Sequence, residues 1–229
     1  MDHREIPRDH LDGDSLPGPG GLRLRRWLEE DLPALLEAYE DPAMRRWLAT
    51  QVSGADGAAA WLEAQRTGWE TGTRFAFAVT EAVTEASTEA VTATGRDVRR
   101  GGEPLGNIVL KRPDPHDDRA EVGYWTTAAA RGRGVASRAL TVLTDWAFTN
   151  FAEQGLARLE LLHQVDNGAS CRVAEKCGYT LERVLPALPP DYPLDGHVHV
   201  REAPAAALSR PAGRRAEAAG TGGGRASGR

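Results

Sequence analysis

The chain has 229 residues, of which 41% are hydrophobic, and a formal net charge of −5. A chain of this size can bury one good core, and its acidic balance argues against a protein that binds nucleic acid through overall positive charge. It contains no run of about 18 apolar residues that could span a bilayer, and residues 1–21 lack the apolar segment of a signal peptide. We therefore expect a cytoplasmic protein with no membrane-spanning segment.

The first half of the chain predicts one strand, two helices and a second strand. From Leu22, apolar and basic residues alternate as in a strand. Residues 31–33, Asp-Leu-Pro, supply an N-cap and a first-turn proline, which predicts a helix that ends near Tyr39. A second helical stripe ends at Gly72, and residues 74–80 have the pattern of a strand.

Three segments have the composition of disorder. Residues 80–103 repeat a Thr/Ser-Glu-Ala unit and then add charge and glycine, and such polar repeats usually stay solvated. We interpret them as a mobile insertion in a hairpin whose deletion should be tolerated, with a partner-docking segment as the functional alternative. Residues 1–21 and the Ala/Gly/Arg tail at 204–229 offer little to pack, so the ordered domain is predicted to span 22–203.

The second half alternates strands and helices. An amphipathic helix begins at Gly134 with apolar residues at the i, i+3, i+4, i+7 spacing. Asn167 can cap a second helix, which Gly178 ends. The predicted strands are residues 104–111, 120–126, 158–165 and 179–185, with 197–201 as a polar candidate for the last one.

The stretch from Arg131 to Ala136, Arg-Gly-Arg-Gly-Val-Ala, lies between a predicted strand and the amphipathic helix. The first turn of a helix leaves backbone N–H groups unpaired and carries partial positive charge, so it can bind a pyrophosphate. Gly132 and Gly134 let the backbone approach the phosphate oxygens, and Arg131 and Arg133 can add charge-assisted contacts.

Other interpretations of this stretch are weaker. An RNA-contacting Arg-Gly tract would repeat and would lack an amphipathic helix behind it. The chain shows no Gly-Lys-Ser/Thr of a nucleoside triphosphatase, and no Gly-x-Gly-x-x-Gly with an acidic partner for a dinucleotide. Kinase and dehydrogenase functions are therefore disfavoured, and we expect no specific nucleic-acid partner.

Residues 131–136 fit the Arg/Gln-x-x-Gly-x-Gly/Ala coenzyme A signature, and the chain from Leu22 to Arg201 resembles the GNAT superfamily of N-acyltransferases. Its RimJ/RimL branch, which acetylates protein N-terminal amines, is similar in four further stretches. These are Asp-Pro-Ala-Met-Arg-Arg-Trp-Leu at 41–48, Ala-Glu-Val-Gly-Tyr-Trp at 120–125, Val-Asp-Asn-Gly-Ala-Ser at 165–170 and Arg-Val-Ala-Glu-Lys-Cys-Gly-Tyr at 172–179.

The resemblance implies a mixed α/β fold, a largely antiparallel sheet of six or seven strands with helices on both faces. It also implies acetyl-CoA as co-substrate, bound where two central strands part. Asn167 would contact the pantetheine in addition to its role as an N-cap. The other implied coenzyme contacts are Trp125, Thr126 and Thr127 in the strand, and Arg131, Gly132, Arg133, Gly134, Val135 and Ala136 in the turn and helix.

Acyl transfer to an amine needs a neutral amine and a proton for the departing thiolate. Glu121, on the same strand face as Gly123 and Trp125, is the candidate base, with a paired or solvated strand glutamate as the equal alternative. By resemblance Ser170 relays the proton, although it could merely bond the local backbone. Ala174 stands where many relatives have a tyrosine acid. A weak base suits an α-amine of pKa about 7.7–8.0 better than a lysine of about 10.4.

We predict no metal site. His197 and His199 can share a strand face, but two ligands without a third are typical of an ordinary strand. Cys171, Cys177 and His163 are not at a recognised metal spacing, so we interpret them as packing residues, and the two cysteines as reduced and buried.

The sequence therefore predicts an acetyl-CoA-dependent N-acetyltransferase, as a monomer or homodimer. Its acceptor would be a protein N-terminal amine or a small amine, including amine-bearing antibiotics. The alternative is a non-catalytic acyl-CoA sensor or scaffold, which needs the phosphate turn but neither Glu121 nor Ser170.

Overall fold

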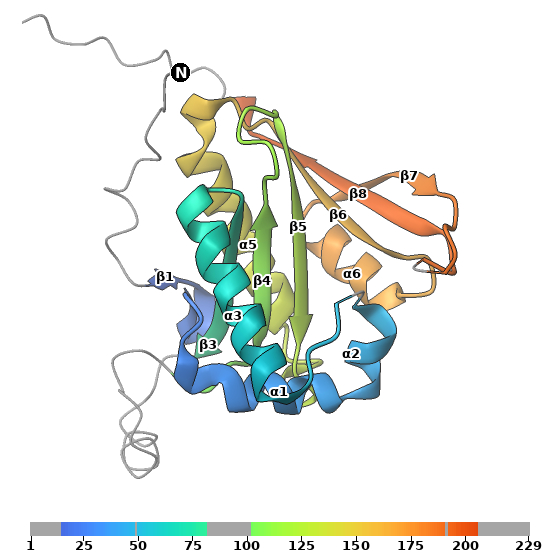
Figure 1. Cartoon of the computed structure of the whole chain (residues 1–229). Coiled ribbons are helices and arrows are strands. Elements are labelled where there is room, and N and C mark those ends of the chain that lie inside the picture. The colour runs from blue at the N-terminus through green and yellow to red at the C-terminus, as the bar shows by residue number, and fades with distance from the viewer. Residues whose placement is uncertain (1–14, 49, 82–101, 191, 206–229) are drawn as a thin grey trace, which may run out of the picture.

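The computed structural model describes residues 15–48, 50–81, 102–190 and 192–205 (Figure 1). Most of the predicted insertion and tail, and the first fourteen residues, lie outside this part of the chain. The described helices are α1 (Leu32–Glu40), α2 (Pro42–Trp47), α3 (Gly54–Thr71), α5 (Val135–Asn150) and α6 (Gly168–Lys176). The strands are β1 (Ser15–Pro17), β2 (Leu22–Arg25), β3 (Arg74–Glu81), β4 (Gly106–Lys111), β5 (Arg119–Thr126), β6 (Arg158–Gln164), β7 (Thr180–Leu185) and β8 (Gly196–Glu202).

The strands form one sheet in the order β1-β2-β3-β4-β5-β6-β8-β7. Every pair is antiparallel except β5 with β6, which run parallel. The predicted mixed, largely antiparallel α/β fold is confirmed, with eight strands rather than six or seven. No helix in the described ranges is long and apolar enough to cross a membrane.

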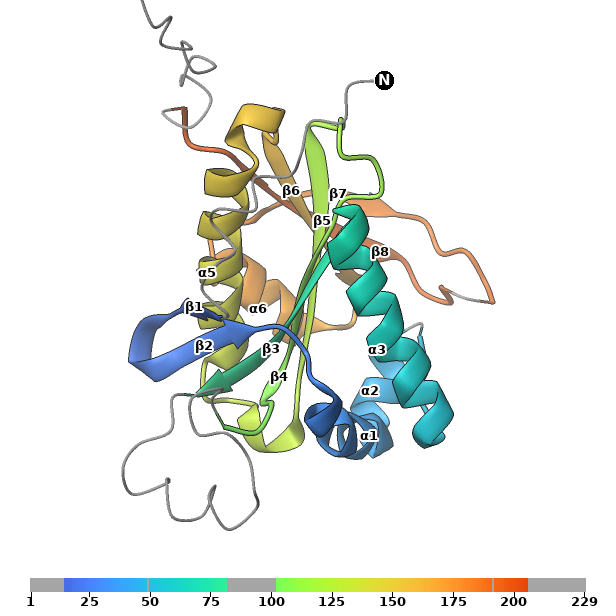
Figure 2. The same cartoon turned by 60° about the vertical axis from the view of Figure 1, so that its left-hand side comes forward.

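Helices cover both faces of the sheet, with α1 and α3 on one side and α5 and α6 on the other (Figure 2). Successive side chains of β5 point to opposite faces of the sheet. Val122 packs in the cluster beneath α5, and Trp125 packs in the cluster beneath α1 and α3. Each layer of helices thus covers its own apolar cluster, and β5 contributes side chains to both clusters.

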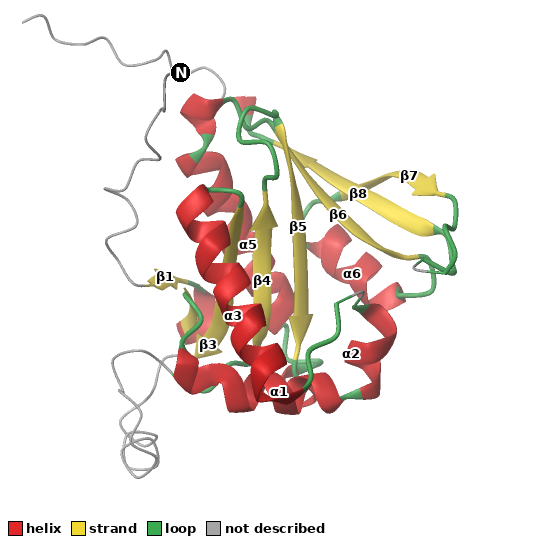
Figure 3. Ribbon diagram, viewed as in Figure 1, coloured by secondary structure: helices red, strands yellow, loops and turns green. Residues whose placement is uncertain are grey.

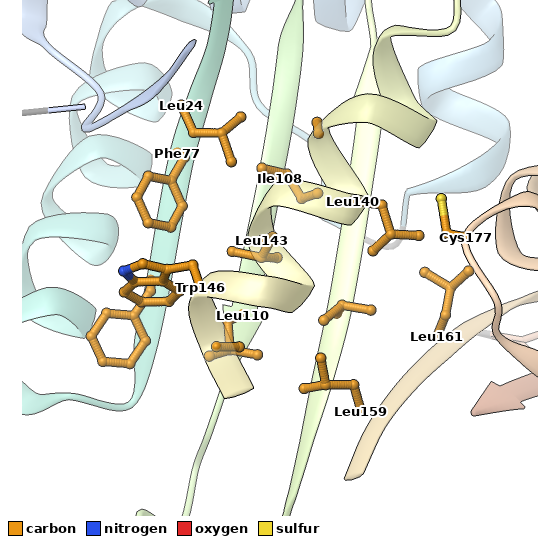
Figure 4. Packing of buried hydrophobic residues seen from close by; sticks show 14 of the residues in the cluster. Leu24, Phe77, Ile108, Leu110, Leu140, Leu143, Trp146, Leu159, Leu161 and Cys177 are labelled. Carbon is orange, nitrogen blue, oxygen red and sulfur yellow. The ribbon is translucent and has the colours of Figure 1, made fainter. Parts of the chain in front are cut away.

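The larger cluster lies between α5 and the sheet (Figure 4). Leu140, Leu143 and Trp146 recur on one stripe of α5, as the sequence spacing predicted, and all three are buried. Trp146 meets Phe77 edge to face at 5.3 Å between ring centroids. This packing fixes the axis of α5, and with it the position of the helix N-terminus at the end of β5.

Two local predictions were wrong, and a third was left open by the sequence. Residues 15–17 were expected to be disordered, but they form β1 and pair with β2. Asp31 was predicted to cap α1 with its side chain; instead its carboxylate binds the Arg25 guanidinium at 2.6 Å, and both side chains are buried. The polar segment at 197–201, predicted as a candidate last strand, does form a strand: β8 spans seven residues and lies between β6 and β7.

The sheet splits between its two parallel strands. Hydrogen-bonded pairing of β5 with β6 covers only residues 119–122 and 158–161, although both strands continue beyond it. Figure 3 shows the two strands side by side at one end and well apart at the other. β6 instead stays paired with β8 along its whole length. The last four residues of β5 therefore have no strand partner on their β6 side.

Candidate active site

A cavity of about 510 Å³ lies at the open end of the split. Its walls come from α2, the last residues of β5, the N-terminus of α5 and the length of α6. The predicted residues that line it are Trp125, Thr126, Arg131, Gly132, Gly134, Val135, Ala136, Asn167 and Ser170. A more open hollow of about 630 Å³ beside the C-terminal end of α6 contains none of the predicted residues, so the cavity at the split is the candidate site.

The wall formed by α5 has the properties of an anion-binding site. No side chain in the described ranges caps the first turn of α5, and the first N–H groups of a helix have no partners within it. Val135, Ala136 and Ser137, which form that turn, all line the cavity. Unpaired donors and the positive end of the helix dipole thus meet at one wall.

Gly132 and Gly134 have φ values of 73° and 72°, in the left-handed region that side chains disfavour. A Cβ built on Gly132 would meet no atom within 4 Å, and one on Gly134 would meet only Ser137 Oγ at 3.8 Å. The protein itself therefore does not crowd either position. Glycine is required by the backbone conformation, and it leaves the space in front of the helix open to a ligand.

The predicted arginines are both engaged in ion pairs. Arg131 lines the cavity and contacts Asp41 at 2.5 Å, while Arg133 pairs with Glu81 at 2.7 Å and does not line it. The backbone N–H of Ala43 and, secondarily, the Arg131 guanidinium lower the pKa of Asp41 below its usual value. Asp41 therefore stays ionised and holds Arg131 against α2.

Two other cations in the cavity lining were not predicted from the sequence. Arg172 and Lys176 lie one turn apart on α6 and line the cavity, whose described lining includes no Asp or Glu. Their i, i+4 spacing was visible in the sequence, but their direction depends on how α6 docks. With Arg131 they give the cavity a positive lining, which suits a ligand that carries several phosphates.

Ser170 lies in a hydrogen-bonded chain at the N-terminus of α6. Its backbone N–H donates to Asn167 Oδ1 at 3.1 Å, so the predicted N-cap is confirmed. Its hydroxyl accepts a hydrogen bond from Tyr124 Oη at 3.1 Å. Burial raises the pKa of Tyr124 to about 12, so this phenol remains protonated and acts as the donor. Tyr124 lines the cavity and was not predicted from the sequence.

Two predicted residues have other surroundings. Thr127 donates its backbone N–H to Leu105 at 2.9 Å, which continues the ladder between β4 and β5, and it does not line the cavity. Glu121 is also absent from the lining, and its carboxylate pairs with Lys111 at 2.5 Å across β4 and β5. These contacts favour the ion-pair alternative for Glu121, while its catalytic role stays an untested prediction.

Helix α2 forms the wall opposite α5. Met44, Trp47 and Leu48 line the cavity there, so Trp47 faces the groove although only part of its surface is buried. Arg46 reaches across to Asp166, before α6, at 2.6 Å. Large apolar side chains on one wall and cations on the others give the cavity two chemically distinct parts.

The structure is therefore an α/β domain with helices on both faces, whose mostly antiparallel sheet parts beside a helix N-terminus that can bind an anion. The chain belongs to the GNAT acetyltransferase family, because the family model described as "Acetyltransferase (GNAT) domain" matches residues 21–180.

Among curated proteins, the chain is similar to the ribosomal-protein-serine acetyltransferase of Escherichia coli (strain K12). The two are 36% identical over 84 residues, which is 36% of this chain and 45% of that protein. The matched part thus spans less than half of the relative.

Solved structures share the fold at lower identity. A RimL ribosomal L7/L12 alpha-N-protein acetyltransferase in complex with coenzyme A superimposes with a TM-score of 0.67 at 18% identity, covering 82% of this chain and 97% of that one. The microcin C7 self-immunity acetyltransferase MccE, in complex with acetyl-CoA and AMP, gives 0.63 at 16% identity, covering 80% and 93%.

Proposed function

We propose that this protein is an acetyl-CoA-dependent N-acetyltransferase whose acceptor is a primary amine, with a protein N-terminal α-amine favoured over a lysine. The observation that carries the proposal is the first turn of α5, uncapped by any described side chain, at the wall of a cavity that opens between β5 and β6. The family match supports the acyl-transfer chemistry. The similarity to a ribosomal-protein-serine acetyltransferase and a RimL protein supports the acceptor.

The coenzyme would lie along three parts of the cavity. Its diphosphate would accept hydrogen bonds from the N–H groups of Val135 and Ala136, with Gly132 and Gly134 leaving room for the oxygens. Arg172 and Lys176 would attract its remaining phosphate charge. The pantetheine arm would then pair with the free edge of β5 at Trp125 and Thr126, where β5 is no longer paired with β6.

The chemical step needs the amine nitrogen to attack the thioester carbonyl, form a tetrahedral oxyanion and expel the thiolate. The nitrogen becomes positively charged on attack and must lose a proton, whereas the sulfur must gain one. Ser170 Oγ would accept a proton from the attacking nitrogen while it donates its own hydroxyl proton to the sulfur. Because Tyr124 occupies one lone pair of Ser170 Oγ as a donor, the hydroxyl hydrogen of Ser170 is directed elsewhere.

The contacts of Glu121 bear on the acceptor. With Glu121 paired to Lys111, no carboxylate lines the described cavity, so a base strong enough to deprotonate a lysine ammonium is not provided there. An α-amine with a pKa of about 7.7–8.0 is already substantially neutral at physiological pH, whereas a lysine of about 10.4 is not. The chemistry of the site thus matches a low-pKa amine.

The test is acceptor-dependent release of free thiol from acetyl-CoA. The panel contains peptides with free N-termini, the same peptides with blocked N-termini and one lysine, polyamines and aminoglycosides. We expect the free-terminus peptides to react fastest. Saturable coenzyme binding with no thiol release from any acceptor would indicate a sensor or scaffold and would contradict the proposal.

A further inference from the structure

Four potential metal ligands meet beside the split, outside the described lining of the coenzyme cavity. They are His163 in β6, Cys171 in α6, and His197 and His199 in β8. One nitrogen or sulfur atom of each lies within 4.8 Å of the corresponding atoms of all the others. From the sequence, His197 and His199 were interpreted as two ligands without a third, and His163 and Cys171 as packing residues without a recognised metal spacing.

The register of the sheet brings the histidines together. His163 is paired directly with His197 in the antiparallel ladder of β6 and β8, and His199 lies two residues further along the same face. The His163 ring stacks on His199 with centroids 5.1 Å apart, and meets His197 at 5.4 Å. Helix α6 covers this face and brings Cys171 Sγ to 3.5 Å from His163 Nε2 and 3.3 Å from His197 Nδ1.

The hydrogen bond of His163 to the backbone turns a ring lone pair toward Cys171. His163 Nδ1 lies 2.8 Å from the carbonyl oxygen of Gln164, which can only accept, so the proton is on Nδ1 and Nε2 carries a lone pair. That lone pair faces Cys171 Sγ. Cys171 Sγ lies within contact distance of ring nitrogens of both His163 and His197, so three potential ligand atoms already converge on one point.

His199 is the clearest sign of a missing partner. His199 is 1% exposed, and neither ring nitrogen makes a hydrogen bond of ordinary geometry with a described residue, although the Tyr179 backbone lies nearby. A buried polar group without a partner is rare in folded proteins, so the ring nitrogens of His199 are available to an added ligand.

We propose that His163, Cys171, His197 and His199 bind one Zn²⁺ ion in a closed, tetrahedral site. Three imidazole nitrogens and one thiolate are a ligand set that suits zinc and disfavours Mg²⁺ and Ca²⁺. Bond lengths of about 2.0–2.1 Å to nitrogen and 2.3 Å to sulfur place tetrahedral ligands roughly 3.3–3.8 Å apart. The two contacts of Cys171 already match that range, and the wider pairs need only ring rotations and small shifts.

The surroundings meet the other requirements of such a site. The Gln164 carbonyl fixes the His163 tautomer, which is the usual second-shell support of a metal-binding histidine. Glu175, one turn after Cys171, acts electrostatically on Cys171 and on His199, and its negative charge would offset the positive charge of the complex. His163, Cys171 and His197 are each partly exposed, which leaves a route for the ion.

A metal here would tie α6 to the β6–β8 pair. Cys171 follows Ser170 directly, so the ion would hold the turn that carries the proposed proton relay. The metal ion itself takes no part in the proposed acyl transfer. Metal binding and acetyl transfer can therefore fail independently of each other.

The experiment is a titration of reduced, metal-stripped, untagged protein with Co²⁺, which reports both geometry and sulfur ligation. We expect saturation at one equivalent, with the intense visible bands of a tetrahedral ion and a near-ultraviolet thiolate-to-cobalt charge-transfer band. One equivalent of Zn²⁺ should remove both features and raise the melting temperature. These readouts on the unaltered protein do not depend on how well any variant folds.

Matched variants assign the ligands. Cys171→Ser should abolish the charge-transfer band, whereas Cys177→Ser, which alters the only other cysteine, should retain it, because Cys177 instead donates to the Ser137 carbonyl. His199→Gln should weaken Zn²⁺ binding by more than the 10- to 100-fold typical of losing an outer-shell partner. His116→Gln, in an exposed turn, should leave binding unchanged.

Three results would overturn the proposal. The first is no saturable Co²⁺ spectrum at micromolar protein. The second is a spectrum with only the weak bands of an octahedral ion, which would mean loose surface binding. The third is a charge-transfer band that survives in Cys171→Ser and disappears in Cys177→Ser.

Discussion

Two walls of the cavity, formed by α5 and by α6, are built in different ways. On the α5 wall, the groups that would bind the coenzyme come from six consecutive residues, Arg131 to Ala136, which end one loop and begin one helix. On the α6 wall, the hydrogen-bonded pair of Tyr124 and Ser170 joins residues 46 positions apart. The first wall depends on local backbone conformation, whereas the second depends on how α6 docks against β5. Substitutions in the glycine turn before α5 should therefore affect coenzyme binding, whereas substitutions of the Tyr124–Ser170 pair should affect turnover.

Ser170→Ala should have the largest effect, and on turnover alone. If Ser170 moves the proton, its loss removes a positioned acid–base group, which is worth about 10²–10⁴ in rate. The affinity for acetyl-CoA should change less than about threefold, because the Asn167 cap bonds the backbone N–H of residue 170 and not its hydroxyl. Stopped-flow kinetics and calorimetry on the same preparation separate the two quantities. A large loss of affinity with unchanged turnover would contradict the relay.

Gly134→Val should act on the other wall, through binding. A β-branched residue at φ 72° costs roughly 1–2 kcal/mol of strain, and its side chain would occupy the space in front of the helix. Losing the N–H contacts as well should weaken coenzyme binding by about 100-fold or more. Calorimetry with coenzyme A measures it directly.

Gly155→Val is the matched control. Gly155 also has a left-handed φ, of 83°, but it ends the short turn after α5 and does not line the cavity. It should incur the same strain without loss of coenzyme affinity. If both variants bind equally badly, the effect of Gly134→Val is one of stability, and the α5 wall is not the phosphate site.

The sequence predicted local features of both the α5 wall and the α6 wall, but not the contact that joins α6 to β5. The glycine turn, the helix stripe and the Asn167 cap are local patterns, and each lies where the pattern placed it. The Tyr124 contact depends on the face of β5 that meets α6, and no short-range pattern encodes that.

The same limit explains the errors in the fold. Asp31 has the position of a cap but meets Arg25 of β2 in the interior, where a charge must be paired. The sequence left the place of β8 in the sheet open because the strand is polar, and two of its polar residues are the histidines that face α6.

Tyr124→Phe should have a moderate effect on turnover. It removes one neutral hydrogen bond to Ser170 Oγ, which is worth about 0.5–1.5 kcal/mol, or roughly 2- to 13-fold in rate. The ring keeps its packing, so coenzyme affinity should stay the same. In the double variant with Ser170→Ala, the second substitution should add nothing, because the two hydroxyls act as one unit. Full additivity in kcat would show that they act separately.

Glu121→Gln should have the smallest effect, and it decides a question that the sequence left open. Glu121 is about 40% exposed and pairs with Lys111. Exposed ion pairs contribute at most about 1 kcal/mol to stability, so we expect the free energy of unfolding to fall by less than that and kcat/KM to change less than about threefold. A general base would instead lose about 10²–10⁴ in rate.

Lys111→Met completes this test, because it removes the other partner and leaves the carboxylate. If Glu121 serves only in the ion pair, kcat/KM should be nearly unchanged in both variants. If Glu121 is the base, only Glu121→Gln is slow, and its rate should recover as the pH rises past the acceptor's own pKa, since a neutral amine no longer needs the carboxylate. Such a result would place a catalytic group outside both walls, at the end of β5 that is still paired with β6.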